Sequence, residues 1–492
     1  MQGLLITLFN MSEFKKPSSE KAFEKNFAQI KPLMNDTQAF YESSRCLFCF
    51  DAPCVNACPT GIDIPLFIRQ ISTGSNEGAS KTIYDSNWLG HSCGQVCPTE
   101  VLCEGACVYN NQDVNPIDIG RLQAYATDKV IQSKKNLFLV GKPNGKKVAI
   151  IGAGPAGISC ACELRTYGYE VDIYEAKAKP SGLTVYGVAP YKITNKAALD
   201  EIDYLQKQFD FKIHYNSPIS SNKDLAKLEK NYKAIFIGIG LGATSIIGLP
   251  GDKLKNCVGA VEFVAKLRMG HQRVHVGNKV VVLGGGNTAM DAASESARMG
   301  AEEVTLAYRR SRDEMGAYEF EYDLAKGVGA NGVFNLTPIE IIGKKKVEGV
   351  RFIRNKSAYG EIEPIEGSEF TIDCDMVILA TGQSKQVGFL EKIESLKLDK
   401  KGRIMDNRGR IVVNPETHQT NNPKYFAAGD AVNGGVEVVN AVYEAKIAAK
   451  GIHKYLAGKD GSRKITIPAP PSSKGVKKKK GGKKSVLKNP NS

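Results

Sequence analysis

The pattern of hydrophobic and polar positions changes near residue 145. The chain before that point reads as helical segments joined by loops rich in Gly, Pro and Asn, with few runs of β-branched residues. The polar stretch 141–147, which contains Gly and Pro, predicts a linker. Beyond it, short apolar runs alternate with helical segments, so we expect a helical domain followed by α/β domains.

Two strand–glycine–helix units organise the second part of the chain. The first begins at residue 147 with KVAIIGAGPAG, and the second begins at residue 278 with NKVVVLGGGNTA. Residues 232–240 and 375–382 read as further buried strands. Strands that alternate with helices predict parallel sheets. Two such units predict two Rossmann-like dinucleotide-binding domains.

The first glycine motif, GAGPAG, follows a predicted strand directly and opens a predicted helix. In this context the first glycine makes a tight turn, the second lets the backbone approach a pyrophosphate, and the third lets the helix pack on the strand. A glutamate after the next strand can accept hydrogen bonds from ribose hydroxyls. The predicted binding residues of this unit are Gly152, Gly154, Pro155, Ala156, Gly157 and Glu175.

The second glycine motif, GGGNTA, has the same context, with Ala289 at the third, packing position. The residue after the next strand is basic: Arg309, followed by Arg310. A carboxylate there would repel a 2′-phosphate, whereas guanidinium groups pair with it. The arginine pair therefore favours NADPH, and it does not exclude NADH. The predicted binding residues are Gly284, Gly285, Gly286, Asn287, Thr288, Arg309 and Arg310.

Eight of the twelve cysteines lie between Cys46 and Cys107. Disulfides are disfavoured because the rest of the chain is typical of a cytosolic enzyme in a reducing compartment. Two zinc sites of four cysteines each are an open alternative. Iron–sulfur ligation explains more, because in ferredoxin-like runs the cysteine before a proline ligates the second cluster. Cys58 and Cys97 both precede a proline.

Composition and charge limit the function classes. No run approaches the roughly 18 apolar residues of a membrane helix, and the N-terminal MQGLLITLFN lacks the basic start and the cleavage site of a signal peptide. We therefore expect a cytoplasmic protein, with Met11 as an alternative initiator. Residues 461–492 contribute +10 to the formal net charge of +14. A disordered basic tail explains that excess without a nucleic-acid function.

Two later segments resemble the shared motifs of two-dinucleotide-domain flavoproteins. A short strand that ends at Gly429-Asp430 resembles their second flavin fingerprint, and ATGQ at 380–383 resembles their other common motif. The resemblance implies FAD in the first site and an FAD domain split by the second nucleotide domain. The implied organisation is a helical domain at 1–140, an FAD domain at 146–254 and 382–460, an NAD(P)H domain at 255–381, and the tail at 461–492.

The cysteine segments, together with PIDIGRLQAYAT, resemble the N-terminal domain of dihydropyrimidine dehydrogenase and are similar to the small subunit of glutamate synthase. The resemblance implies two 4Fe–4S clusters. It implies Cys46, Cys49, Cys54 and Cys107 as ligands of the first, and Cys58, Cys97, Cys103 and Gln123 as ligands of the second. Cys93 is the alternative fourth ligand of the second cluster. The family's flavin contacts fall here on Gly182, which follows a serine instead of a glycine, and on Lys192, which stands where arginine is common.

These features predict the electron-input subunit of a larger oxidoreductase, which passes electrons from NADPH through FAD and the clusters to a partner. Because the chain lacks the FMN barrel of animal dihydropyrimidine dehydrogenase, we expect an FMN-containing, pyrimidine-reducing partner subunit. The large subunit of glutamate synthase is the alternative partner. A zinc-bearing nucleotide-binding scaffold or a non-catalytic electron-transfer module is the alternative of another class. Asp291 and Glu314 are polar residues near the second motif, and a positioning role and a surface position are equally supported for them.

Overall fold

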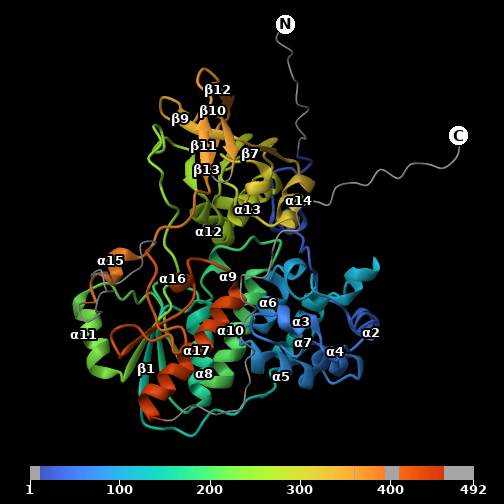
Figure 1. The fold of residues 1–492 in the computed structure, drawn as a ribbon, viewed down its shortest axis with the longest axis vertical. Coiled ribbons are helices and arrows are strands. Elements are labelled where there is room, and N and C mark those ends of the chain that lie inside the picture. Colours follow the sequence, from blue (N-terminus) through green and yellow to red (C-terminus); the bar gives the residue numbers. More distant parts are fainter. Residues whose placement is uncertain (1–11, 359–360, 394–408, 459–492) are drawn as a thin grey trace, which may run out of the picture.

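The structure is a computed structural model, and it describes residues 12–358, 361–393 and 409–458. Figure 1 shows three regions: helices of the N-terminal part, an α/β region beside them, and a second α/β region above both. The observed fold class is therefore the predicted one, helical followed by α/β with parallel sheets. The predicted basic tail and the first eleven residues lie outside the described residues.

The N-terminal region is built from short helices around one long helix, α7. Apolar side chains of α4, α5 and α7 form its core, with Phe67, Ile68, Ile83 and Leu122 fully buried. Burial of this apolar surface is what holds such short helices in place, because helices of this length are marginal alone. The elements are α1 (Glu20–Asn26), α2 (Asp36–Ser44), α3 (Pro53–Ala57), α4 (Ile64–Ser72), α5 (Asn76–Ser86), α6 (Gly90–Val96), η1 (Thr99–Val101), η2 (Val108–Gln112) and α7 (Ile119–Ser133).

The first α/β region contains a parallel sheet of order β14-β4-β1-β2-β3. The edge strand β14 comes from far along the chain and pairs with β4. The strands are β1 (Lys147–Ile151), β2 (Glu170–Tyr174), β3 (Lys212–His214), β4 (Ala234–Ile237) and β14 (Tyr425–Ala427). Its helices are α8 (Pro155–Thr166), α9 (Leu183–Tyr186), α10 (Asn195–Phe209), α11 (Asn222–Asn231), α16 (Asp430–Asn433) and α17 (Val438–Ala457).

The second α/β region repeats this plan and carries an additional antiparallel sheet. Its parallel sheet has the order β5-β13-β6-β7-β8, and β10 is central in the other, pairing with β9, β11 and β12. The strands are β5 (Cys257–Gly259), β6 (Lys279–Leu283), β7 (Glu303–Ala307), β8 (Ala330–Val333), β9 (Leu336–Ile342), β10 (Gly349–Ala358), β11 (Glu361–Pro364), β12 (Phe370–Asp373) and β13 (Met376–Leu379). Its helices are α12 (Ala260–Gly270), η3 (His271–Arg273), α13 (Asn287–Arg298), η4 (Arg312–Glu314) and α14 (Glu319–Gly327), whereas α15 (Val387–Leu390) packs on the first region.

The N-terminal segment that contains α1 packs on the second α/β region and not on the other helices of its own region. Phe27 is buried in the core of that α/β region, and Phe23 packs against the same core. The Asn26 side chain donates to the Arg298 carbonyl at 2.7 Å, and Ile30 N donates to Tyr191 O at 2.9 Å. The helical part of the chain thus contacts both α/β regions.

A buried polar network joins the helical region to the first α/β region. Lys446 of α17 is fully buried, and its ammonium donates to the carbonyls of Asp85 and Ser86, 2.6 and 3.1 Å away. Glu163 lies 3.8 Å from that ammonium and accepts from the Trp88 indole at 2.9 Å. Buried charges that are paired in this way are costly to break, so these contacts fix the two regions against each other.

A search for membrane-spanning segments among the described residues finds no helix with the length and apolar character to cross a bilayer.

Candidate functional site

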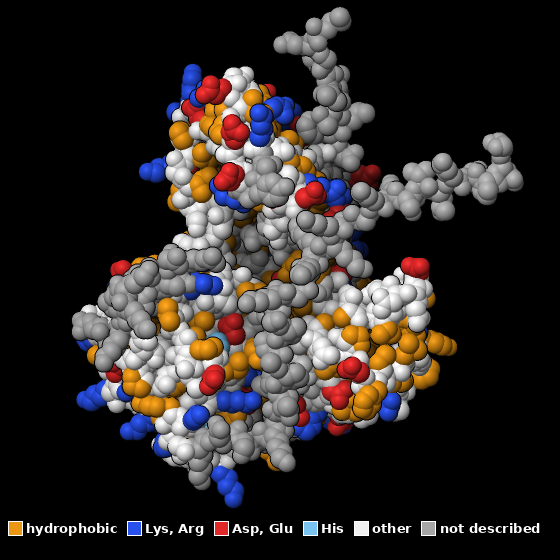
Figure 2. All heavy atoms as spheres, in the orientation of Figure 1, with side chains coloured by type: hydrophobic (Ala, Val, Ile, Leu, Met, Phe, Trp, Pro, Cys, Tyr) orange, Lys and Arg blue, Asp and Glu red, His pale blue; other side chains and the backbone are white. Residues whose placement is uncertain are grey.

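A cavity of about 1150 Å³ lies where the two α/β regions meet the helical region. The molecule narrows there in the space-filling view (Figure 2). Both glycine motifs open onto this cavity, and so does the segment after β14. The predicted site residues that line it are Gly152, Gly154, Pro155, Ala156, Glu175, Gly182, Lys192, Gly286, Asn287, Thr288, Gly429 and Asp430.

The first glycine motif has backbone geometry that only small residues allow. Gly152 has a φ of +101°, and a Cβ added there would lie 2.5 Å from the Gly238 oxygen. A Cβ on Gly157 would lie 1.9 Å from the Gly152 oxygen, so the start of α8 packs directly on the turn. A Cβ on Gly154 would meet only Gly182 Cα, at 3.9 Å. The backbone at Gly154 therefore faces open cavity at the N-terminus of α8, which fits a pyrophosphate.

Glu175 and Gly429 complete the wall of the first unit. Glu175 is buried, and its two oxygens accept from Ala153 N at 2.7 Å and from Lys177 N at 2.8 Å. Each oxygen keeps a further lone pair for a ribose hydroxyl. Gly429 has a φ of +77°, and its Cα approaches α8 so closely that an added Cβ would lie 3.1 Å from Ala156 Cβ. These residues fit an adenine dinucleotide.

Ser181 and Gly182 form a tight corner against this turn. Ser181 has a φ of +77°, and its N–H donates to the Ala153 oxygen at 2.7 Å. The Ser181 hydroxyl is buried and has no hydrogen-bond partner. A serine in this conformation is strained, because its Cβ crowds the backbone. Ser181, which stands where glycine was expected, thus preserves the tight turn but makes the folded protein less stable.

The second glycine motif differs from the first in the side chains that pack against it. An added Cβ on Gly285 would lie 2.5 Å from the Tyr308 ring, whereas one on Gly286 would meet nothing within 4 Å. The Asn287 side chain accepts from Tyr318 N at 3.0 Å and so fixes the segment before α14. Of this motif, Gly286, Asn287 and Thr288 reach the cavity, and Gly284 and Gly285 lie behind it.

Arg309 and Arg310 follow β7 beyond this motif, and neither lines the cavity. Arg309 is exposed, and Arg310 is half-buried. The Arg309 carbonyl accepts from the Asn355 side chain and the Arg310 carbonyl from Asn335 N, both at 3.0 Å. The backbone of the pair is therefore fixed, while the Arg309 guanidinium faces solvent at the rim of the second region.

Lys192 lies in a buried group of acids, of which the sequence analysis named Asp291 but not Glu321. Its ammonium is 2.7 Å from Asp291 Oδ1 and 2.7 Å from Glu321 Oε1. Asp291 Oδ1 also accepts from the Tyr191 hydroxyl at 2.7 Å. Although burial opposes it, the two carboxylates raise the pKa of Lys192, which stays charged. Asp291 is buried and paired, so a solvated surface position for it was the wrong alternative.

Glu437, like Glu321, lines this cavity and was not predicted from the sequence. Glu437 precedes α17 and accepts from the Tyr318 hydroxyl at 2.9 Å. Burial raises the pKa of Glu437 and raises that of Glu321 to about 7. The Lys192–Glu321 pair joins residues 129 positions apart, so no sequence spacing could reveal it. Acidic residues within helices next to the glycine motifs were the only available signal.

The first four predicted cluster ligands surround a second, small cavity. Cys46, Cys49, Cys54 and Cys107 all line it, together with apolar residues such as Leu47. Burial, followed by the neighbouring thiols of Cys46 and Cys107, raises the pKa of Cys54 to about 12. Thiols gathered so closely in an apolar wall need a cationic centre between them to be thiolates. This donor set fits an iron–sulfur cluster.

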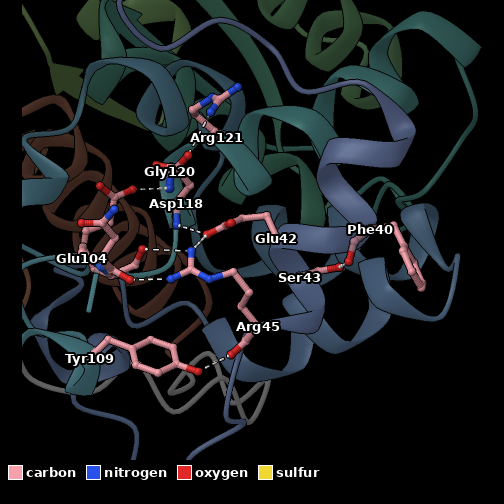
Figure 3. Close-up of polar contacts among 11 residues, drawn as sticks. Phe40, Glu42, Ser43, Arg45, Glu104, Tyr109, Asp118, Gly120 and Arg121 are labelled. Carbon is pink, nitrogen blue, oxygen red and sulfur yellow. Dashed lines mark hydrogen bonds and ion pairs between the residues drawn. The ribbon is translucent and has the colours of Figure 1, made fainter. Parts of the chain in front are cut away.

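Polar contacts fix the backbone beside these cysteines (Figure 3). Arg45, next to Cys46, donates to Glu42 Oε1 at 2.6 Å, and the Tyr109 hydroxyl donates to the Arg45 carbonyl at 2.7 Å. Glu42 Oε1 also accepts from Asp118 N at 2.9 Å. Glu104, next to Cys103, accepts from Gly120 N at 2.9 Å. The cysteine loops are thereby anchored to α2 and to the start of α7.

The second group of cysteines lies beside the large cavity. A side-chain hydrogen bond with Cys93, then burial, then the nearby thiols of Cys103 and Cys58 raise the pKa of Cys97. Val96 and Pro98, which flank Cys97, both line the large cavity. Within the described ranges no group of three or more His, Cys, Asp or Glu side chains is arranged to hold a metal ion. The neighbouring thiols of Cys58, Cys97 and Cys103 are donors of the type that holds an iron–sulfur cluster.

Gln123 and Cys93 both lie near this second group. The Gln123 amide nitrogen donates to the Gly90 carbonyl at 2.6 Å, which leaves the amide oxygen as the end available to a ligand. Cys93 is 1% exposed, and its thiol donates to Asn87 Oδ1 at 3.8 Å. The geometry of the side chains thus keeps both residues as candidates for the fourth ligand.

Two protein families match the chain. Residues 23–135 match the family described as dihydropyrimidine dehydrogenase domain II, 4Fe–4S cluster. Residues 146–445 match the pyridine nucleotide-disulphide oxidoreductase family. The boundary between the two matches falls at the linker that the sequence predicts.

Curated relatives match over nearly their whole length. The NAD-dependent dihydropyrimidine dehydrogenase subunit PreT of Escherichia coli K12 is 34% identical over 430 residues, covering 87% of this chain and 97% of PreT. The glutamate synthase [NADPH] small chain of the same organism is 33% identical over 463 residues, covering 90% of this chain and 96% of the relative. Identity alone therefore does not separate the two.

Among solved structures, FprA of Mycobacterium tuberculosis in complex with NADPH is similar, with a TM-score of 0.52 and 21% identity. The similarity covers 64% of this chain and 85% of FprA. At this identity it supports the fold of the two α/β regions.

Replacing Ser181 with glycine should stabilise the protein. The change removes the strain of a positive φ at a non-glycine residue and removes an unpartnered buried hydroxyl. We expect a gain of roughly 1 kcal/mol in the free energy of unfolding, measured by denaturant titration. Asp210→Gly is the matched control, because Asp210 also has a positive φ but is exposed and of a type that tolerates it. A Ser181→Gly protein no more stable than the wild type would contradict the strain.

Proposed function

Because the chain belongs to the family of pyridine nucleotide-disulphide oxidoreductases that carry an N-terminal 4Fe–4S domain, we propose that it is the electron-input subunit of a dihydropyrimidine dehydrogenase. Its family makes the chain an NAD(P)H-dependent oxidoreductase with FAD and 4Fe–4S groups. We propose three further points: the identity of the partner, the identity of the bound nucleotide and the roles of the individual site residues.

One observation carries the proposal: a single cavity is lined by both glycine motifs and by the residues that flank Cys97. When bound, the nicotinamide, the flavin and the clusters supply hydride transfer and one-electron transfer. The chain's own residues supply position. Gly152–Gly157 and Glu175 would hold FAD, Gly286–Thr288 would hold the nicotinamide nucleotide, and Cys97 would keep a cluster beside the cavity.

We propose a domain division that follows the sheets: 146–254 with 382–460 for FAD, and 255–381 for NAD(P)H. The strand pairing supports it, because β14 joins β4 of the first sheet, whereas β5 and β13 belong to the second. The helical domain, 1–140, would then use its first helix to contact the NAD(P)H domain.

The glutamate synthase small subunit is the second candidate, and the arginine pair after β7 favours it. Arg309 and Arg310 suit a 2′-phosphate, and the relative with glutamate synthase activity in its name uses NADPH, whereas PreT is named NAD-dependent. Motif context favours the first candidate, since PTEVLCEGAC, PIDIGRLQ and YRRSRDEM resemble dihydropyrimidine dehydrogenase subunits.

Capture of the native partner should decide between the two. We expect the full-length chain to co-purify with an FMN-containing subunit, and the complex to oxidise NAD(P)H in the presence of uracil but not of glutamine plus 2-oxoglutarate. The reverse substrate dependence would establish the second candidate. A colourless chain that contains zinc and is not bleached by either nucleotide would exclude both.

Alanine at Arg309 and Arg310 should weaken NADPH selectively. Loss of charge-assisted contacts to a 2′-phosphate costs about 1.5–3 kcal/mol, so KM for NADPH should rise tenfold or more while KM for NADH stays unchanged. Initial rates of flavin reduction with both nucleotides measure this. Arg312→Ala is the matched control, since Arg312 is exposed nearby and pairs with Glu319. An equal loss for both nucleotides would refute the 2′-phosphate role.

Gln123→Ala should remove one cluster, whereas Cys93→Ala should keep both. The reason is that the Gln123 amide oxygen is not used in the bond to Gly90, whereas the buried Cys93 thiol already contacts both Asn87 and Cys97. Iron and acid-labile sulfide per chain, together with paramagnetic resonance of the reduced protein, measure the outcome. The opposite result, with the cluster lost only in Cys93→Ala, would make Cys93 the fourth ligand.

A further inference from the structure

The electron route leaves one proton behind in the cavity. Oxidation of NAD(P)H to NAD(P)+ delivers two electrons and one proton as a hydride. The electrons leave singly through the clusters to the partner's redox centre, and iron–sulfur clusters carry no proton with them. One proton per turnover must therefore leave the cavity, and side chains that line it can accept that proton, if the proposed function is right.

The charges around Lys192 include one carboxylate more than the ammonium can neutralise. Lys192 pairs with both Asp291 and Glu321, and their side chains are about 90% buried. A surplus charge in such a site is costly, and binding a proton removes it. All three residues line the cavity, so the surplus carboxylate lies where the proton is released.

Hydrogen bonds decide which of the two carboxylates takes the proton. Asp291 Oδ1 accepts from both Lys192 and the Tyr191 hydroxyl. Glu321 Oε1 accepts from Lys192 alone, and Glu321 Oε2 is buried with no hydrogen-bond partner. The Asp291 charge is thus better stabilised, and Glu321 Oε2 is the vacant position.

We propose that Glu321 takes up the proton at Oε2 and passes it toward the protein surface, with Lys192 and Asp291 holding its carboxylate in position. The O–H bond forms at Oε2 as the cavity releases H+, and it breaks when the proton moves on. Glu100 faces Glu321 closely enough to influence it electrostatically, and it is 37% exposed and paired with Lys31 at 3.0 Å. Glu100 is the exit.

The surroundings make this exchange feasible near neutral pH. Burial, followed by the neighbouring Asp291 charge, raises the pKa of Glu321 to about 7. The other titratable groups that face this site come from every element around it: Tyr191 and Lys192 after α9, Asp291 and Glu295 on α13, Tyr318 before α14, Glu437 before α17, and Glu100 on η1. Burial and the nearby Asp291 raise the pKa of Glu295, against the opposing influence of Arg268 on α12, of Lys192 and of Arg298 on α13.

Infrared difference spectroscopy of the electrochemically cycled holoprotein tests the proposal. We expect a carbonyl band of a protonated carboxylic acid that shifts in D2O and whose amplitude changes across neutral pH. The band should vanish in Glu321→Gln, return at another frequency in Glu321→Asp, and remain in Glu319→Gln, a control at an exposed acid of the same helix. Reoxidation of the flavin should slow about tenfold or more in Glu321→Gln and recover in Glu321→Asp.

A band that persists in Glu321→Gln, or no carboxylic band in the wild type, would overturn the proposal. If Glu321→Gln loses FAD, the wild-type band decides: an amplitude that stays flat across neutral pH excludes Glu321. These outcomes are distinct from failure of the proposed function. That function fails when NAD(P)H does not bleach the wild-type flavin, whatever the infrared spectrum contains.

Discussion

One buried carboxylate fixes the helix that carries the cysteine nearest the large cavity. Glu201 of α10 accepts from His91 N at 2.7 Å, from Ser92 N at 2.9 Å and from the Ser92 hydroxyl at 2.6 Å. These N–H groups begin α6, so an anionic side chain of one region caps the helix of another. Cys97 follows the same helix at its other end. The distance between cavity and second cysteine group therefore depends on Glu201, and Lys446 reinforces the junction.

The local parts of the site were predictable because their causes are local. A glycine turn between a buried strand and a helix needs residues at fixed spacing, and Gly152, Gly157 and Glu175 follow that rule. The resemblance of the cysteine segments to a known family implied that Cys46, Cys49, Cys54 and Cys107 form one group, and these four residues line one small cavity. The antiparallel sheet β9–β12 was not predicted, because its half-exposed strands, such as β11, have no continuous apolar run. The grouping of Asp291 and Glu321 around Lys192 was not predicted, because only tertiary packing brings α13 and α14 next to that lysine.

The cavity wall combines two kinds of constraint. Glycines at 154 and 286 leave backbone open to phosphate groups, and their positions follow from covalent geometry. Lys192, Asp291 and Glu321 are instead held by charge, and each depends on the others being present. The glycine geometry determines which ligand can bind, and the charged residues determine which side chains are ionised beside that ligand. Members of one family that bind different partner subunits can keep the glycine geometry while the charged residues change.

The packing of α1 on the second α/β region has a mechanical consequence. Its strands, β5 to β13, lie in the chain between β4 and β14 of the first sheet, so the chain crosses between the two regions twice. Two crossings alone behave as a hinge and permit rotation about the line between them. The segment around Phe23 and Phe27 adds an attachment from the N-terminal part of the chain. The Lys192 pairs with Asp291 and Glu321 also join the two regions, so a domain swing would have to break these contacts as well as detach the N-terminal helix.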